Sequence, residues 1–272
     1  MKTQHLKHSS YLMESNIENK RLAEKVAPET FIPLYLHKHI RSKSTILDIG
    51  CGPATIVEKL SSQYTESKVT GLDISANRLI QAAKNISYPN LSFISANVYQ
   101  LPYKNDSFDL VFSRLLFEYL QNPQQALMEM NRICKPGGIV LVQDIDGQLN
   151  SHFPEHSQQD NIEQTINDIH NYIGFDPLVG RKLYYYFYHT GLENINVQIE
   201  PYHLIYGRIH QTDETNWIQK LSVVYKKLSQ IKSVDSSKLQ HQIDDYIDYL
   251  KREDSLTFSN LFTVYGRKPY GK

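Results

Sequence analysis

Short apolar runs alternate with segments of helical spacing through the middle of the chain. Five runs have the length and β-branched content of buried strands: 45–49, 68–72, 91–94, 108–113 and 139–142. Three segments between them have helical spacing: 54–64, 76–86, with Ser75 as a cap, and 123–134. Strands that alternate with helices over short connections predict a parallel sheet covered on both faces.

The flanks of this alternation are less regular. Residues 1–44 place apolar residues at helical spacing between charges, and Pro28 and Pro33 interrupt the pattern, so we expect a helical cap. Residues 147–176 are polar and predict a loop and helix inserted after the fifth strand. Four further predictions follow: a helix at 177–190, a strand at 194–206, two helices within 212–252 that break near 233–237, and a last strand at 256–266.

The composition limits the class of protein. The chain has 29 Lys and Arg against 29 Asp and Glu, without the basic excess typical of nucleic-acid binding, so no nucleic-acid partner is expected. Its two cysteines, Cys51 and Cys134, form no C-x-x-C pair, which argues against a zinc knot and a disulfide framework. No apolar run is long enough for a membrane span and the start of the chain is polar, so we expect a cytoplasmic protein.

A loop with two glycines follows the first predicted strand. Asp48-Ile-Gly-Cys-Gly-Pro53 lies at the carboxyl end of that strand, where doubly wound sheets bind ligands. Glycine lets the backbone turn sharply and approach a ligand closely. Asp73 stands at the end of the second strand, where a carboxylate accepts hydrogen bonds from the hydroxyls of a ribose. This pattern predicts a nucleoside site.

Two positions bear on which nucleoside binds. A dinucleotide loop has a small residue three positions after its second glycine, where this chain has Thr55. Asp48 precedes the loop, and its carboxylate would repel a pyrophosphate and attract the ammonium of an amino acid. Both positions favour S-adenosylmethionine over a nicotinamide dinucleotide, which stays open as an outside alternative.

Five motifs in order resemble the core of the UbiE/type-11 class I S-adenosylmethionine-dependent methyltransferases. They lie within residues 45–146: Ile46-Leu-Asp-Ile-Gly-Cys-Gly-Pro53, Gly71-Leu-Asp-Ile-Ser75, Asn97-Val-Tyr-Gln-Leu-Pro102, Ser107-Phe-Asp-Leu-Val-Phe-Ser113 and Lys135-Pro-Gly-Gly138. The end of the chain, 261–269, resembles the closing antiparallel strand of that family.

The resemblance implies an α/β fold and an organisation in three parts. The fold is a Rossmann-like, seven-stranded, mainly parallel sheet with helices on both faces, an antiparallel last strand, and a helical cap and insertions. The parts are a cap at 1–44, a cofactor-binding core at 45–146, and a completion of the core at 147–272. In the last part, insertions at 147–176 and 210–252 would form a substrate lid.

The resemblance also implies roles for single residues. In this chain the loop residues Asp48, Gly50, Cys51 and Gly52 would hold the methionine part of the cofactor, Asp73 its ribose, and Ile74, Asn97 and Val98 its adenine. Ser113 and Arg114 would line the sulfonium end, and Tyr11 and Arg21 would belong to an N-terminal element that closes over the cofactor. Arg21 could meet the cofactor carboxylate or be a solvated helix charge. Asn97 replaces the usual Asp, and its side-chain oxygen can still accept the adenine hydrogen bond.

The acceptor side offers several polar candidates. Methyl transfer from a sulfonium is an in-line displacement, and a base is needed only if the acceptor loses a proton. The candidates are Tyr119, His152, His156, Asp144 and Asp146. Tyr119 stands where relatives often carry His; with an ordinary pKa of about 10 it would orient the acceptor, unless it only packs. Pro154 separates His152 from His156 and no third ligand is evident, so no metal is expected.

The stretch Lys182-Leu-Tyr-Tyr-Tyr-Phe-Tyr188 has too many aromatic residues for one helix face. With Tyr202, Tyr206 and Trp217 it predicts either packing or the wall of an acceptor pocket. The expected function is transfer of a methyl group from S-adenosylmethionine to a small organic acceptor, leaving S-adenosyl-L-homocysteine. A protein or RNA methyltransferase and a non-catalytic cofactor-binding protein stay open, and the pattern does not indicate an oligomeric state.

Overall fold

The computed structural model describes residues 27–155, 174–230 and 235–271. These residues form two units. The core unit holds 27–146, 176–200 and 260–271, and the second unit holds 147–155, 174–175, 201–230 and 235–259. The predicted cofactor residues Tyr11 and Arg21 lie outside the described residues.

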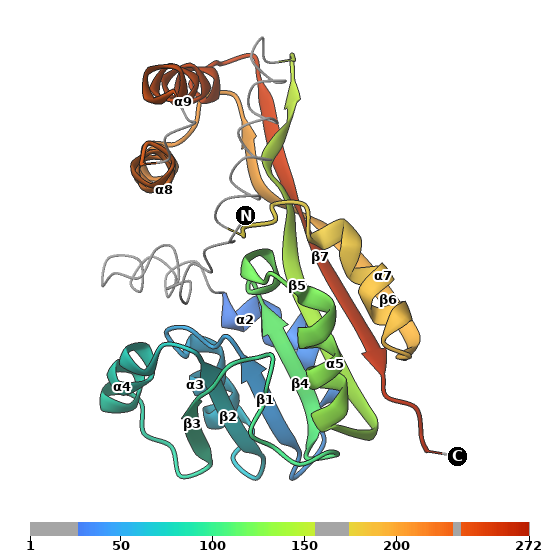
Figure 1. The fold of residues 1–272 in the computed structure, drawn as a ribbon. Coiled ribbons are helices and arrows are strands. Elements are labelled where there is room, and N and C mark those ends of the chain that lie inside the picture. Colours follow the sequence, from blue (N-terminus) through green and yellow to red (C-terminus); the bar gives the residue numbers. More distant parts are fainter. Residues whose placement is uncertain (1–26, 156–173, 231–234, 272) are drawn as a thin grey trace, which may run out of the picture. The chain divides into compact units, whose positions relative to one another are not determined.

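The described strands form one seven-stranded sheet in the order β3-β2-β1-β4-β5-β7-β6 (Figure 1). Neighbours from β3 to β5 are parallel, and β7 points opposite to β5 and β6, so the expected α/β class and the antiparallel last strand are confirmed. The strands are β1 Thr45–Ile49, β2 Lys68–Asp73, β3 Leu91–Ser95, β4 Phe108–Arg114, β5 Cys134–Phe153, β6 Glu193–Tyr206 and β7 Leu256–Arg267. The strand order reverses between β1 and β4, where a ligand-binding crevice is expected.

Helices connect the strands of the core unit where the spacing predicted them. The side chain of Ser75 accepts a hydrogen bond from the Arg78 backbone N–H at the start of α4, and Asn122 does the same for Gln125 at the start of α5. After the helical segment that precedes β1, the core unit contains α3 Thr55–Gln63, α4 Ala76–Asn85, α5 Pro123–Ile133 and α7 Leu183–His189, with the 3-10 turns η3 Phe117–Tyr119 and η4 Gly180–Lys182.

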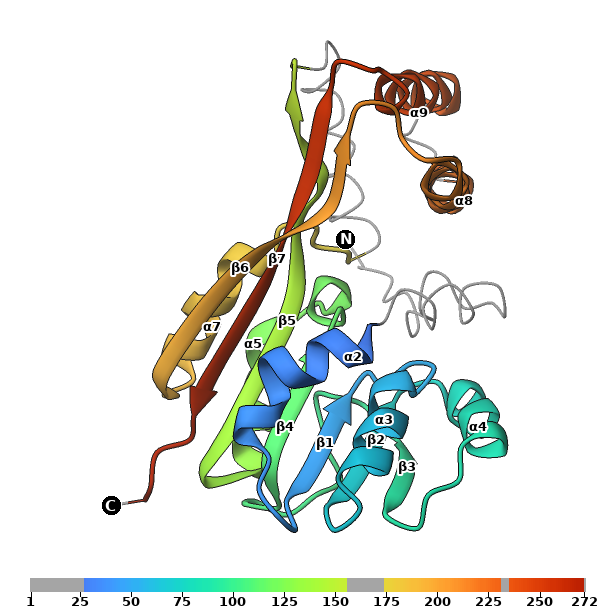
Figure 2. The same cartoon turned by 180° about the vertical axis from the view of Figure 1, so that it is seen from behind.

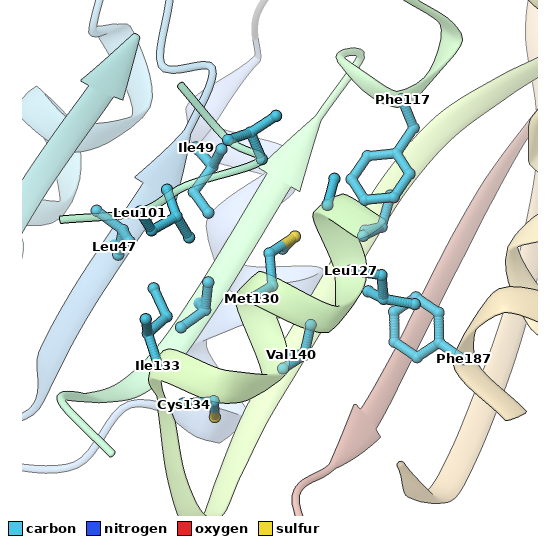
Figure 3. Close-up of a cluster of buried hydrophobic side chains, with 14 of the residues drawn as sticks. Leu47, Ile49, Leu101, Phe117, Leu127, Met130, Ile133, Cys134, Val140 and Phe187 are labelled. Atoms are coloured by element: carbon cyan, nitrogen blue, oxygen red, sulfur yellow. The ribbon is translucent and has the colours of Figure 1, made fainter. Parts of the chain in front are cut away.

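Successive strand residues point to opposite faces of the sheet and enter different hydrophobic clusters. On one face, Leu47 and Ile49 pack with α5, and Figure 3 shows Leu127 and Met130 of α5 directed at this cluster. On the other face, Ile46 packs with α3 and the helical segment before β1, which Figure 2 shows in front of the sheet. We call these the α5 face and the α3 face. Burial on both faces explains the continuous apolar runs in the sequence.

The segment before β1 contradicts the prediction that its prolines interrupt the helix. A helical path runs without a break through α2 Pro28–Phe31, η1 Ile32–Leu36 and η2 His37–His39. Pro28 takes the first helical position, where its missing N–H costs no hydrogen bond. Pro33 lies at the start of η1, a wider π-helical turn that accommodates it.

The prediction of a loop directly after residue 146 is wrong, because β5 continues to Phe153. The polar residues within 147–152 have the composition of a loop, but in the structure they belong to the part of β5 that lies in the second unit. There the Nδ1 atom of His152 lies 3.1 Å from Oγ1 of Thr257 on β7. Residues 156–173, which include His156, lie outside the described part of the chain.

The second unit has its own small aromatic core. It contains α8 Gln211–Leu228 and α9 Ser236–Leu250, which bear out the two helices predicted within 212–252. Trp217, the only tryptophan of the sequence, is buried with Tyr246 and Leu250, and its ring meets that of His203 edge-on at 5.1 Å between centroids. None of the described helices has the length and apolar character that crossing a bilayer needs.

Candidate cofactor site

The glycine loop turns sharply at the carboxyl end of β1. The backbone N–H groups of Gly50 and Cys51 both donate to the carbonyl of Leu72, at 2.7 and 3.0 Å. Gly50 and Gly52 have φ values of 78° and 51°, in the left-handed region where glycine carries no steric penalty. Ala54 shares that conformation and leads directly into α3.

The glycines of the loop and of β2 differ in what surrounds them. A Cβ atom on Gly50 would lie 3.0 Å from Leu116, and one on Gly71 would lie 2.9 Å from the Cys51 sulfur. A Cβ atom on Gly52 would meet nothing closer than the Gly50 carbonyl at 4.0 Å. Packing therefore fixes Gly50 and Gly71, whereas the space in front of Gly52 is open, as a cradle for a ligand requires.

Asp73 ties this loop to the end of β2. Its Oδ2 atom accepts a hydrogen bond from the Gly52 N–H at 3.0 Å, and Oδ1 accepts one from the Ser75 N–H at 2.9 Å. The Nη1 atom of Arg78 lies 3.9 Å from Oδ2. The carboxylate therefore shapes the loop, and its oxygens keep lone pairs for the ribose hydroxyls that the sequence predicts here.

Asp48 is buried on the α3 face between two strand neighbours that lack polar side chains, Gly71 of β2 and Phe112 of β4. Burial and then the charge of Asp73 raise the pKa of Asp48 to about 8, against the opposing effect of Arg114. Burial and these two carboxylates also raise the pKa of the Cys51 thiol. A cation that binds here relieves the repulsion between the carboxylates, so the site suits an ammonium group.

The predicted adenine contacts lie after β2 and β3. Ile74 follows Asp73 with its side chain 60% exposed, which is unusual for a large apolar residue beside a functional loop. Asn97 uses its side-chain oxygen to accept the Tyr99 N–H at 3.0 Å, which closes a turn after β3. Val98 is buried in the cluster of the α5 face. Asn97 therefore keeps one lone pair of that oxygen for the predicted hydrogen bond to adenine.

The two predicted residues at the end of β4 have different surroundings. Ser113 is fully buried and its hydroxyl donates to the Ile49 carbonyl at 2.8 Å, so it joins β4 to β1. Arg114 is half-buried, and its guanidinium carbon lies 5.4 Å from the centre of the Phe31 ring. Its Nε atom donates to Oε1 of Gln143 at 2.7 Å, a residue that the sequence did not single out.

On the α5 face, Asp144 holds the 3-10 turn that carries Tyr119. Its Oδ2 atom accepts hydrogen bonds from the N–H groups of Phe117 and Glu118, at 2.7 and 3.4 Å, and its Oδ1 accepts that of Ile145 at 2.8 Å. Burial and then the charge of Glu118 raise the pKa of Asp144 well above its ordinary value. Three backbone N–H groups occupy the buried carboxylate of Asp144, so the structure gives it a part in holding this turn.

The other candidates for a base also have protein partners. The buried carboxylate of Asp146 accepts hydrogen bonds from the Arg181 backbone N–H at 2.8 Å and from its Nη2 at 2.6 Å. His152 contacts Thr257, as described above. The described residues contain no cluster of three His, Cys, Asp or Glu side chains with the arrangement of a metal site.

The aromatic stretch forms α7 on the α5 face of the core unit. Leu183 and Phe187, one turn apart, are buried in the cluster of that face. Three tyrosines of the same helix are more than half exposed: Tyr184, Tyr185 and Tyr188. One stripe of the helix therefore packs on the sheet, and these three rings lie in solvent in the core unit instead of lining an enclosed wall.

Comparison with known proteins bears on these residues. Residues 47–142 match the family described as "Methyltransferase domain". An uncharacterized methyltransferase of Schizosaccharomyces pombe is 32% identical over 57% of this chain and 59% of its own length. A demethylmenaquinone methyltransferase of Lysinibacillus sphaericus is 36% identical over 39% of this chain and 46% of its own. The chain thus spans less than two thirds of these curated relatives.

The fold is also similar to solved structures. Phosphoethanolamine N-methyltransferase 2 of Haemonchus contortus, solved with S-adenosyl-L-methionine, superimposes with a TM-score of 0.53 at 17% identity. The match covers 94% of this chain and 53% of that protein. At this identity the likeness supports the fold alone.

Proposed function

We propose that this chain transfers the methyl group of S-adenosylmethionine to a small organic acceptor, a proposal supported by the match of residues 47–142 to the family described as "Methyltransferase domain". The observation that carries the proposal is the open space in front of Gly52, whose backbone N–H bonds the Asp73 carboxylate. When bound, S-adenosylmethionine supplies a methyl group on a positively charged sulfur.

The residues around this space fit the parts of the cofactor. The backbone at Gly52 lets the methionine part approach, and the buried carboxyl of Asp48 takes its ammonium. Asp73 accepts hydrogen bonds from the ribose hydroxyls, and the exposed side chain of Ile74 covers one face of the adenine. These groups orient the cofactor and exclude water from one side of it, which is how enzymes lower the barrier of an in-line displacement.

A small acceptor is supported by the name of a similar protein. The Lysinibacillus sphaericus relative is named for a quinone. The balanced charge of this chain supports the same class, because a nucleic-acid acceptor usually demands a basic surface. The turn that carries Tyr119 is held rigidly by Asp144, which suits a phenol that orients an acceptor.

Calorimetric titration of the full chain with S-adenosylmethionine, S-adenosylhomocysteine and NAD tests the cofactor. We expect the first two to bind and NAD not to bind. Asp73→Ala should weaken binding strongly, and Asp73→Asn less, because the amide oxygen can still hold one N–H of the loop. Binding of NAD, or no binding of either S-adenosyl compound, would contradict the proposal.

A second experiment tests the acceptor class. The chain is incubated with cofactor labelled in the methyl group and with an extract separated into small molecules, protein and RNA. Label should enter the small-molecule fraction, and Asp73→Ala serves as the control with weakened cofactor binding. Label in the protein or RNA fraction would assign the acceptor to that class instead.

A further inference from the structure

A buried series of hydrogen bonds starts at Arg114 and crosses the α3 face of the core unit. The Nε atom of Arg114 donates to Oε1 of Gln143 at 2.7 Å, and Nε2 of Gln143 donates to Oγ1 of Thr263 at 2.7 Å. Tyr35, in η1, lies beside both Thr263 and Glu200, which act on the pKa of its hydroxyl. Gln143, Thr263 and Tyr35 are all buried, so water does not compete for these bonds.

The chemistry of the groups gives this series one direction. A guanidinium only donates, so Gln143 must present its oxygen to Arg114 and its amide N–H to Thr263. Thr263 accepts that N–H and keeps its own hydroxyl proton for Tyr35, and the phenol keeps its proton for the Glu200 carboxylate. In agreement with this order, Thr263 lowers the pKa of Tyr35 and Glu200 raises it. Burial and then the bond to Glu200 raise the pKa of Tyr35 to about 12, so the phenol keeps the proton that it donates.

A one-way series is stronger than its separate bonds, because each bond polarises the next. Here it begins at a cation, Arg114, and ends at an anion, Glu200. The series draws on β4, β5, β7, η1 and β6, so the fold of the whole core unit fixes the position of the guanidinium. We call it the Arg114 relay.

Arg114 lies on β4 two residues after Phe112, the cross-strand neighbour of Asp48, so both side chains lie on the α3 face and the positive charge acts on the Asp48 carboxyl. Three other charged or titratable groups act in the same place: Asp73 of β2, Cys51 of the loop, and Arg78 of α4, which pairs with Asp73. Of these influences, the positive charge of Arg114 is the one that favours the ionised form of Asp48. A guanidinium that is free to move away would leave burial and Asp73 unopposed.

We propose that Gln143 is a positioning residue of the cofactor site, and that through it the Arg114 relay keeps the guanidinium at the place from which its positive charge acts on the Asp48 carboxyl. The inference rests on the proposed function, since it assigns the ammonium of the cofactor to Asp48. When the relay is intact, Asp48 ionises readily as the ammonium arrives. In a variant without Gln143, ionising Asp48 costs more free energy. Cofactor affinity therefore falls at every pH at which Asp48 is protonated before the cofactor binds.

The test titrates the full chain with S-adenosylhomocysteine between about pH 6 and about pH 9. For Gln143→Met we expect affinity about tenfold below wild type near pH 6, and a ratio that falls to about twofold near pH 9, where Asp48 is mostly ionised in wild type and about half ionised in the variant. Titration of the ligand's own amine cancels in this ratio. A merely structural loss would give a ratio that does not change with pH.

Gln124→Met is the matched control. Nε2 of Gln124 donates to Oγ1 of Thr190 at 2.7 Å, the same type of bond at the same length as that from Gln143 to Thr263, but between α5 and α7. We expect it to lower the melting temperature about as much as Gln143→Met while the affinity ratio stays at one. Thr263→Val interrupts the relay one step further on and should give the same trend with pH, more weakly, even if Gln143→Met fails to fold.

The outcomes separate the two proposals. If wild type does not bind S-adenosylhomocysteine, the proposed function is wrong and this inference falls with it. If wild type binds, but the ratios for Gln143→Met and Thr263→Val equal one or are independent of pH, the positioning role is wrong and the proposed function stands.

Discussion

Two buried aspartates, Asp48 of β1 and Asp144 of β5, lie on opposite faces of the sheet near its carboxyl edge. Both have a raised pKa, and burial is the first cause in each case. Asp144 accepts three backbone N–H groups, whereas Asp48 accepts none from the described residues and is governed by nearby charges, chiefly Asp73.

The difference shows how similar burial can serve two purposes. A carboxyl that backbone N–H groups satisfy is committed to holding its own chain, and removing it leaves those donors unpaired. A carboxyl that is buried beside a like charge is poorly stabilised until a cation arrives. We therefore expect Asp144 to matter for stability and Asp48 for ligand affinity.

The largest effect, a loss of affinity for S-adenosylhomocysteine, should come from Asp48→Asn. The change keeps the size of the side chain and removes the charge that would meet the cofactor ammonium, so affinity for S-adenosylhomocysteine near pH 8 should fall about a hundredfold. Calorimetric titration measures the affinity, and circular dichroism checks that the fold is intact. Unchanged affinity in a folded variant would remove the distinction between the two aspartates.

Asp144→Ala should show the reverse behaviour. The free energy of unfolding should fall by about 2–3 kcal/mol, because the N–H groups of Phe117 and Glu118 lose their acceptor in a buried place. Urea denaturation measures this loss, and the affinity for S-adenosylhomocysteine should change little. Asp144→Asn keeps one acceptor oxygen and should lose less. A loss of affinity as large as that of Asp48→Asn would mean that both carboxyls serve the ligand.

The dependence of stability on pH sharpens the role of Asp48. Its pKa is about 8 in the folded chain and 3.8 as the ordinary value. A raised pKa in the folded state means that the contribution of Asp48 to stability is greatest below 3.8 and is lost as the pH rises to about 8. The gain in melting temperature of Asp48→Asn over wild type should therefore grow from about pH 5 to about pH 9. A gain that is constant over this range would contradict the assignment.

The smallest effect on stability should come from breaking an ion pair whose carboxylate lies in solvent. Asp254, in the second unit, pairs with Arg252 at 2.8 Å, and both side chains are exposed. The bond to Arg252 lowers the pKa of Asp254, but water screens such pairs. We expect no measurable change in melting temperature for Arg252→Ala. A clear fall in melting temperature would show that this exposed ion pair also stabilises the fold, and would contradict the expected difference between exposed and buried carboxylates.

Local patterns in the sequence were sufficient for the first half of the fold. The strand bounds from β1 to β4, the cap at Ser75, and the turn at Gly50 and Gly52 depend on residues close together in the chain. Period-two and helical spacing report such features directly. The class of fold and the methyltransferase domain could therefore be predicted.

Contacts between segments that are far apart in the chain could not be predicted from such local patterns. Gln143 appears in the sequence as one more residue of a strand, and only its pairing with Arg114 and Thr263 reveals a role. Ser113 was predicted beside the sulfonium from its place at the end of a strand, and only the structure shows that its hydroxyl donates to the Ile49 carbonyl of the neighbouring strand. The polar end of β5 resembled a loop because its strand partners lie more than a hundred residues away, as Thr257 does from His152.

The buried Trp217 allows the second unit to be followed separately by fluorescence. Because it is the only tryptophan of the chain and lies in α8, selectively excited fluorescence reports on that unit and not on the core. Far-ultraviolet circular dichroism, by contrast, averages over both. Denaturation followed by both signals will show whether the unit with the two long helices melts together with the methyltransferase domain or before it.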